Sequence, residues 1–351
     1  MSLILFSVFF IWNIVIFYLY YKKDYGVFQT PCLFSIVSLA FTVPQLYKII
    51  NLRENPDDYM SLSLLVLITC NMALTMGFSY GSKYPIIQKE KACFIPNRVW
   101  VIAVFFAIIG IGATLMNRGV YKGGFISGIF VIINFFATYA DYLLVLILIT
   151  LYKRMHIPWF IYLLLAIIIL LQIDKFIISA RRGEAIQFIL TISFFYFFVH
   201  PKEIYRKYKF IIPLFFIIGV LLNSQIGRYR ENSYSGKVSV IENIKKLKVS
   251  DTNKLETLKN VETNNAIIGI NSCYENGVYD YGTYNWNGLV QNFIPKSLVG
   301  TNLKESLMFA NSNKALIRQL SKSGSTMTGY FDAFSSFGVF AFLKFLILGM
   351  F

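Results

Sequence analysis

Residues 2–21 read SLILFSVFFIWNIVIFYLYY and contain no charged side chain. About twenty predominantly apolar residues in a helix are enough to cross the hydrocarbon core of a bilayer. No cation precedes this run, Lys22 and Lys23 follow it, and it lacks a small-residue cleavage site. The pattern predicts a retained transmembrane helix with its N-terminus outside, and not a cleaved signal peptide.

The composition of the whole chain extends this interpretation. Of 351 residues, 56% are hydrophobic and 15% are charged, and the mean hydropathy is +0.58. A soluble domain carries roughly 25% charged residues. The net charge of +15 suits contact with anionic lipid and phosphate. No basic motif of a nucleic-acid-binding domain accompanies it, so we expect membrane lipid and no nucleic acid as a partner.

Further apolar runs predict an all-α polytopic membrane protein with about nine transmembrane helices. The runs lie near 2–21, 28–49, 61–80, 99–116, 126–152, 158–178, 184–200, 210–225 and 328–350. The 126–152 run is long for one span, and its first part can instead lie in the interface or re-enter the membrane.

One long polar stretch interrupts these runs. We therefore divide the chain into a transmembrane bundle over 1–225, a large extracytoplasmic loop over 226–326 and a final transmembrane helix over 327–351. The final segment is apolar up to Phe351, so this helix is either short or truncated. Spacing at 237–262 predicts amphipathic helices, and we expect the loop to be ordered against the membrane domain. Cys93 and Cys273 fall in loops.

The orientation follows from the cations in the short loops. Twelve Lys and Arg residues lie in the loops after the first, third, fifth and seventh spans, against seven in the alternate loops. The first set is Lys22, Lys23, Lys83, Lys89, Lys91, Arg98, Lys153, Arg154, Lys202, Arg206, Lys207 and Lys209. These loops are expected to be cytoplasmic, which puts 226–326 outside the cell membrane.

Two pairs of arginines are candidates for binding an anionic group. Arg181 and Arg182 lie in a tight turn before the run at 184–200, where guanidinium groups and free helix amides can meet at a phosphate. Arg228 and Arg230 follow the eighth span and share one face if the segment is extended. The alternative is that all four simply anchor their segments to the lipid headgroups.

Acidic and aromatic residues supply further candidates. Asp332 lies in an otherwise apolar run, where ionisable groups are costly and usually functional. The alternative is an ion pair with one of the arginines. Aromatic and amide side chains over 279–288, which include Tyr281 and Trp286, can stack on sugars or simply pack a loop. Asp57 and Asp58 suit a metal or, more simply, a solvated loop.

The arrangement resembles the oligosaccharide repeat unit polymerases, the Wzy-type O-antigen and capsule polymerases. Three patches carry the resemblance: the turn at 179–183, the stretch from Tyr281-Gly282 to Ile294-Pro-Lys-Ser-Leu298, and Gly329-Tyr-Phe-Asp-Ala-Phe-Ser-Ser-Phe-Gly338. The family usually has further spans after this point.

The resemblance implies a C-type glycosyltransferase-like fold and a metal-independent polysaccharide polymerase without a cofactor. The donor and acceptor would be undecaprenyl-diphosphate-linked glycans, and a chain-length regulator protein a partner. Asp332 would orient or deprotonate the acceptor hydroxyl, with Arg181 and Arg182 on the diphosphate leaving group. The substrate-binding candidates are Arg228, Arg230, Lys296, Tyr281, Trp286 and Tyr330.

Two alternatives from other classes remain. A lipid-linked oligosaccharide flippase or transporter would explain the spans and the intramembrane charges, but it usually has paired structural halves, which the sequence does not show. An O-antigen ligase would use the same kind of donor, but that family carries a characteristic His in its large outer loop. This chain has no His between 226 and 326.

Overall fold

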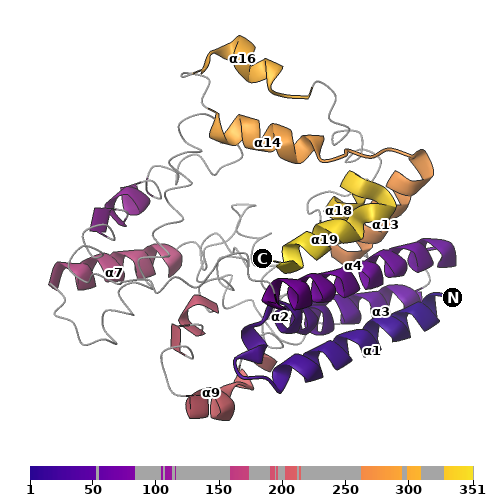
Figure 1. Ribbon diagram of the computed structural model, residues 1–351, viewed down its shortest axis with the longest axis horizontal. Coiled ribbons are helices and arrows are strands. Elements are labelled where there is room, and N and C mark those ends of the chain that lie inside the picture. The colour runs from indigo at the N-terminus through magenta and orange to yellow at the C-terminus, as the bar shows by residue number, and fades with distance from the viewer. Residues whose placement is uncertain are drawn as a thin grey trace, which may run out of the picture.

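The computed structural model describes residues 1–52, 55–83, 104–105, 107–112, 115, 159–173, 190–193, 195–196, 202–211, 213–214, 262–294, 299–309 and 328–350. Within these residues the chain is all-helical and has no strand, as predicted (Figure 1). The main helices are α1 (Ser2–Tyr21), α2 (Thr30–Val37), a π-helical turn η2 (Ser38–Thr42), α3 (Val43–Leu52), α4 (Asp57–Lys83), α7 (Trp159–Ile173), α9 (Lys202–Tyr208), α13 (Glu262–Asn276), α14 (Thr283–Phe293), α16 (Thr301–Ser306), α18 (Gly329–Phe337) and α19 (Ala341–Met350).

Among the residues that the structure describes, four helical segments are long and apolar enough to cross a membrane. They are Ser2–Tyr21, Thr30–Leu52, Asp57–Lys83 and Gly329–Met350. These helices coincide with the predicted spans near 2–21, 28–49, 61–80 and 328–350. The run at 158–178 contains α7, which has 15 residues in the described range. The predicted run at 126–152 lies wholly outside the described residues, and those at 99–116, 184–200 and 210–225 are described only in part. The count of nine spans therefore stays a prediction.

Helices α1 and α4 run parallel, because matching positions along them are hydrogen-bonded. Ser2 donates to Asp57 at one end, and the Asn71 side chain donates to Asn13 at 3.3 Å midway. At the far end the hydroxyls of Tyr20 and Ser79 are 3.5 Å apart. Lys22, Lys23 and Lys83 therefore lie at one end of the bundle.

Helix α9 lies at this same basic end. Its Arg206 pairs with Asp24 at 3.0 Å, and the Lys209 ammonium donates to the Tyr21 carbonyl at 2.8 Å. The buried Tyr205 hydroxyl accepts a hydrogen bond from the Val27 amide at 3.0 Å. The loops after the first, third and seventh predicted spans thus share one end, which agrees with their assignment to one side of the membrane.

Helix α13 belongs to the opposite end of the bundle and comes from the long polar stretch. Its Asn271 amide donates to the Tyr59 carbonyl at 3.0 Å and to the Ser63 hydroxyl at 3.1 Å. Near its start, the Thr263 hydroxyl donates to Gln45 at 2.6 Å. Helix α13 therefore packs against α3 and α4, while the large outer loop over 226–326 stays a prediction. The amphipathic segment expected at 237–262 lies outside the described residues except for its last residue.

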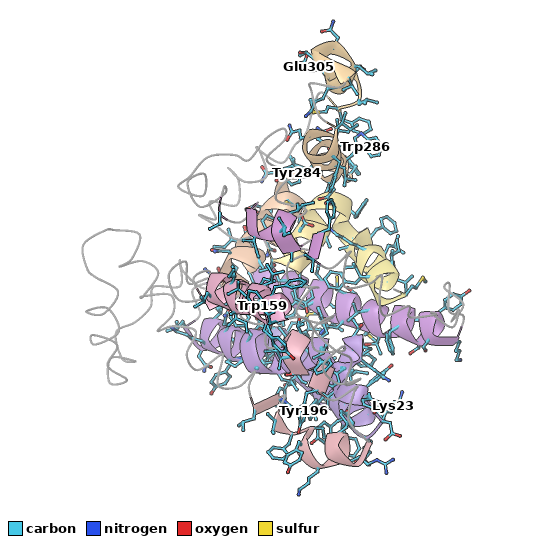
Figure 2. All side chains as sticks on the ribbon, turned by 90° about the vertical axis from the view of Figure 1, so that its left-hand side faces the viewer. Lys23, Trp159, Tyr196, Tyr284, Trp286 and Glu305 are labelled. Atoms are coloured by element: carbon cyan, nitrogen blue, oxygen red, sulfur yellow. The ribbon has the colours of Figure 1, made fainter. Side chains whose placement is uncertain are left out.

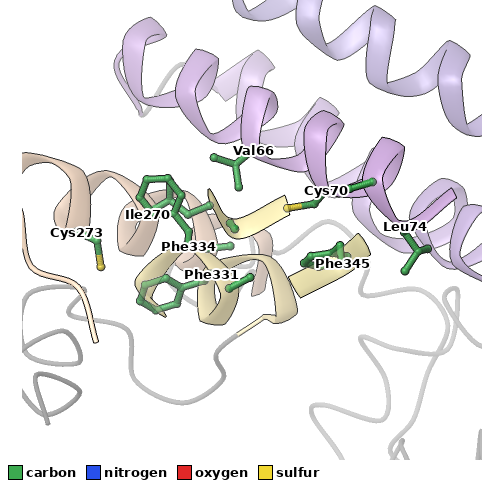
Figure 3. Close-up of a cluster of buried hydrophobic side chains, with 12 residues drawn as sticks. Val66, Cys70, Leu74, Ile270, Cys273, Phe331, Phe334 and Phe345 are labelled. Atoms are coloured by element: carbon green, nitrogen blue, oxygen red, sulfur yellow. The ribbon is translucent and has the colours of Figure 1, made fainter. Parts of the chain in front are cut away.

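A core of buried side chains joins α4, α13, α18 and α19 (Figure 3). Val66 and Cys70 come from α4, Ile270 from α13, and Phe331 and Phe334 from α18. Cys273, which the sequence analysis assigned to a loop, is instead fully buried on α13 in this core. Residues separated by more than 250 positions therefore pack into one unit.

Backbone contact between α4 and α19 is unusually close. A Cβ added to Gly77 would lie 2.0 Å from the Leu346 carbonyl oxygen, and one added to Gly349 would lie 2.2 Å from that of Leu74. Gly81, four residues after Gly77, makes a similar approach to Met350. Small residues at this spacing let transmembrane helices meet along their backbones, where packing replaces the hydrophobic effect that lipid cannot supply.

We expect Gly77→Leu to lower the thermal unfolding temperature of the purified protein in detergent. Overpacking typically costs about 1–3 kcal/mol, and here the new side chain meets backbone that cannot rotate away. The control is Met76→Leu, because the adjacent Met76 is 65% exposed. Equal unfolding temperatures for the two variants would contradict the close contact.

Candidate functional site

The structure describes four of the nine residues predicted for the site: Asp332, Tyr281, Trp286 and Tyr330. The five cationic candidates lie outside the described residues, namely Arg181, Arg182, Arg228, Arg230 and Lys296. Their assignment to a diphosphate stays a prediction. The four described residues form the acidic and aromatic part of the predicted site.

Asp332 lies in the first turn of α18 and forms an ion pair with Lys344 of α19. The side chains are 25% and 28% exposed, so both charges are largely withdrawn from solvent. The alternative of an ion pair for Asp332 is therefore met by Lys344, and the arginines named in that alternative lie outside the described residues. Two charges inside an apolar segment stabilise each other where either alone would be costly.

A sharp bend at Gly338 makes this ion pair possible. Twelve residues of straight α-helix would place Asp332 and Lys344 about 18 Å apart along the axis, which is too far for their side chains. Gly338 has φ +58° and ψ −131°, a conformation that residues with a Cβ rarely adopt. The chain then passes through one 3₁₀ turn, Gly338–Phe340, before α19 begins.

Residues just before α14 stabilise the bend by hydrogen bonds to the end of α18. The amide of Asp280 donates to the Ser335 carbonyl and that of Tyr281 to the Ser336 carbonyl, both at 2.8 Å. The Tyr279 ring lies against Gly338, since a Cβ there would be 3.1 Å from it. Burial, as the main cause, raises the pKa of Tyr279. The second and third family-like patches thus meet through their backbones.

Asp280 is a buried acidic residue that organises the start of α14. It is 2% exposed, and its carboxylate accepts hydrogen bonds from the Thr283 hydroxyl at 2.7 Å and from the Tyr284 amide at 3.0 Å. A carboxylate that accepts amides at a helix start satisfies donors that the helix itself leaves open. Tyr281, next to it, has a positive φ of 52° and is 72% exposed.

Tyr330 lies inside the bundle, apart from the exposed aromatic residues. Its hydroxyl donates to Asn71 at 2.7 Å, and Asn71 in turn donates to Asn13. Its ring stacks on Phe345 with centroids 5.2 Å apart and meets Phe34 edge-on. Its contacts fix the position of α18 against α2, α4 and α19, two residues before Asp332. A role in substrate binding stays a prediction.

Trp286 is accessible and lies on α14. Its ring is 47% exposed, and the indole N–H donates to the Leu307 carbonyl at 2.8 Å. In Figure 2 the side chains of Trp286 and Tyr284 stand apart from the helix bundle. The structure therefore brings Tyr281 close to the bend at Gly338, with Trp286 one turn further along, and keeps Tyr330 in the interior.

Sequence reasoning missed three residues of this arrangement: Lys344, Asp280 and Gly338. Lys344 had a usable signal, because it is a lone cation twelve residues after Asp332 in the same apolar run. Asp280 and Gly338 had none, since their burial and backbone conformation depend on a contact between distant segments.

No protein-family model matches this chain, and no curated protein or solved structure matches it.

We expect Asp332→Asn and Lys344→Met each to reduce stability, because each leaves one charge without its partner. The cost should lie between the about 0–1 kcal/mol of an exposed pair and the about 3–5 kcal/mol of a fully buried one. The reversed pair, Asp332→Lys with Lys344→Asp, should recover much of the loss in a thermal unfolding measurement. No recovery in the reversed pair would argue against direct contact.

Gly338→Ala should be destabilising by about 1–3 kcal/mol, because the new methyl group meets Tyr279 and the positive φ becomes strained. The matched control is Gly329→Ala in the same segment. Gly329 has no positive φ, and its nearest contact would be an ordinary 3.9 Å to Phe345. Thermal unfolding of both variants measures the difference, and an unaffected Gly338→Ala protein would show that the bend does not need glycine.

Proposed function

We propose that this chain polymerises undecaprenyl-diphosphate-linked oligosaccharide repeat units by glycosyl transfer at the outer face of a bacterial cytoplasmic membrane. The product would be O-antigen, capsule or exopolysaccharide. The observation that supports this most is the meeting of the two described family-like patches. Tyr281 hydrogen-bonds through its backbone to Ser336, four residues after Asp332. Two patches that carry the resemblance, and that lie far apart in the sequence, are thus in direct contact.

In the proposed reaction a hydroxyl oxygen of the acceptor glycan attacks the anomeric carbon of the donor glycan. The new glycosidic C–O bond forms as the C–O bond to the diphosphate breaks, and that bond's electron pair goes to the diphosphate oxygen. Asp332 takes the hydroxyl proton or orients the hydroxyl. Lys344 holds the Asp332 side chain in place through the ion pair.

The arginines are proposed to act on the leaving group. Charge accumulates on the diphosphate in the transition state, so fixed guanidinium groups stabilise it more than they stabilise the ground state. Arg181, Arg182, Arg228 and Arg230 take this role, with Lys296 in support. Exposed Tyr281 supplies a ring face for the sugars.

The test uses a strain that lacks this gene and carries it back on a plasmid. Single repeat units on the lipid carrier or on lipid A in the deletion strain support a polymerase. Complete loss of surface repeats would instead indicate a flippase, and polymer that accumulates on its lipid carrier without transfer would indicate a ligase.

We expect Asp332→Asn to shorten or abolish the polymer at matched membrane abundance. The reversed pair Asp332→Lys with Lys344→Asp separates chemistry from folding, because it restores the ion pair but removes the carboxylate from position 332. It should fold and still make no long polymer. Arg181→Lys should lose about 10²–10³ in rate, as is typical when a transition-state donor is removed. Normal polymer from all three would exclude these residues from the site.

A further inference from the structure

Helix α14 (Thr283–Phe293) exposes one apolar face and carries no charged residue along its length. Trp286, Leu289 and Phe293 are 47%, 53% and 53% exposed. Their spacing of three and then four residues puts them on the same side of the helix. A helix on a water-exposed surface usually carries charged residues on its outer side. This uncharged apolar face is better suited to an apolar environment than to water.

The polar groups of α14 are bonded to the segment that contains α16. The Asn287 side chain donates to the Phe309 carbonyl at 2.9 Å and accepts from the Phe309 amide at 2.8 Å. The Lys304 ammonium donates to the Gln291 carbonyl at 3.0 Å. On α16 itself, Leu303 is 52% exposed. The two helices form one amphipathic unit, which we call the α14–α16 pair.

The α14–α16 pair is anchored to a membrane-spanning segment. Asp280 and Tyr281 bond to Ser335 and Ser336, which lie six and seven residues inside the candidate span Gly329–Met350. At 1.5 Å per residue, the anchor lies about 10 Å along α18 from its start. Helix α14 begins two residues after this anchor, so it starts beside the membrane and not at the tip of a remote loop.

We propose that the α14–α16 pair lies against the lipid bilayer, with Trp286, Leu289 and Phe293 in contact with lipid. Trp and Phe with Leu on one face, and amides on the other, are typical of helices at a membrane interface. Lipid is the occupant that fits, because the face has no charge to attract a polar partner and is tied to a segment that is long and apolar enough to cross a membrane. This surface does not depend on the proposed polymerase activity.

Quenching of tryptophan fluorescence by brominated phosphatidylcholine tests the contact. The chain has four tryptophans, and Trp12→Phe, Trp100→Phe and Trp159→Phe leave Trp286 as the only tryptophan, which is excited selectively at wavelengths that tyrosine does not absorb. The full chain is reconstituted in vesicles with bromine near the headgroup or deep in the acyl chain. The positive reference is Ile11→Trp in the background with all four native tryptophans changed to Phe, because Ile11 on α1 is 58% exposed.

We expect brominated lipid to reduce the emission of Trp286 by an amount comparable with that of Ile11→Trp. Leu289→Trp in the same tryptophan-free background should be quenched as well, since it shares the face. Gln291→Trp is the matched control, because position 291 lies on the opposite side of α14, and it should lose less intensity. Equal emission of Trp286 in brominated and ordinary lipid would overturn the proposal and indicate that protein covers this face.

Discussion

The described end of the chain depends on one backbone conformation, the positive φ of Gly338. It bends the final apolar segment so that Asp332 reaches Lys344, which a straight helix would prevent. The same bend leaves the carbonyls of Ser335 and Ser336 open to the amides of Asp280 and Tyr281. Without it, Asp332 and Lys344 would lie too far apart to form their ion pair, and the segment before α14 would lose its backbone hydrogen bonds to α18.

The bundle that carries this bend is held by contacts suited to a lipid environment. Apolar side chains gain little by leaving lipid for another apolar surface, so close backbone approach and buried amides must hold the helices together. Gly77 and Gly349 supply the first kind of contact between α4 and α19. Asn13, Asn71 and the Tyr330 hydroxyl supply the second, and they connect α1, α4 and α18 through one chain of hydrogen bonds.

The positions of the described spans could be predicted from the sequence. A bilayer is crossed by a helix of about twenty apolar residues. Charged residues mark the ends of such runs, as Lys22 does after α1 and Asp57 at the start of α4. Asp332 could also be singled out, because a carboxylate in an apolar run is rare. Its partner could not be chosen, since the choice between an arginine and Lys344 depends on a bend that no residue pattern encodes.

The packing of α13 against α4 could not be predicted from sequence patterns either. Asn264, Asn271 and Glu275 make this helix look like part of a polar loop, yet Asn271 is 3% exposed because its amide finds partners on α4. A polar side chain can be buried once its hydrogen bonds are made, and those partners lie some 200 residues earlier in the chain. The same reason hides Asp280, whose burial follows from its bonds at the start of α14.

The distance between the two ends of the segment 329–350 tests the bend at Gly338 most directly. Spin labels at Gly329→Cys and Leu348→Cys, in a background with the four native cysteines replaced by alanine, can be measured by double electron–electron resonance in lipid nanodiscs. A straight helix would separate these positions by about 28 Å along its axis. The bend at Gly338 predicts a distribution centred well below that value. A distribution centred at the straight-helix distance would show that the segment is not bent.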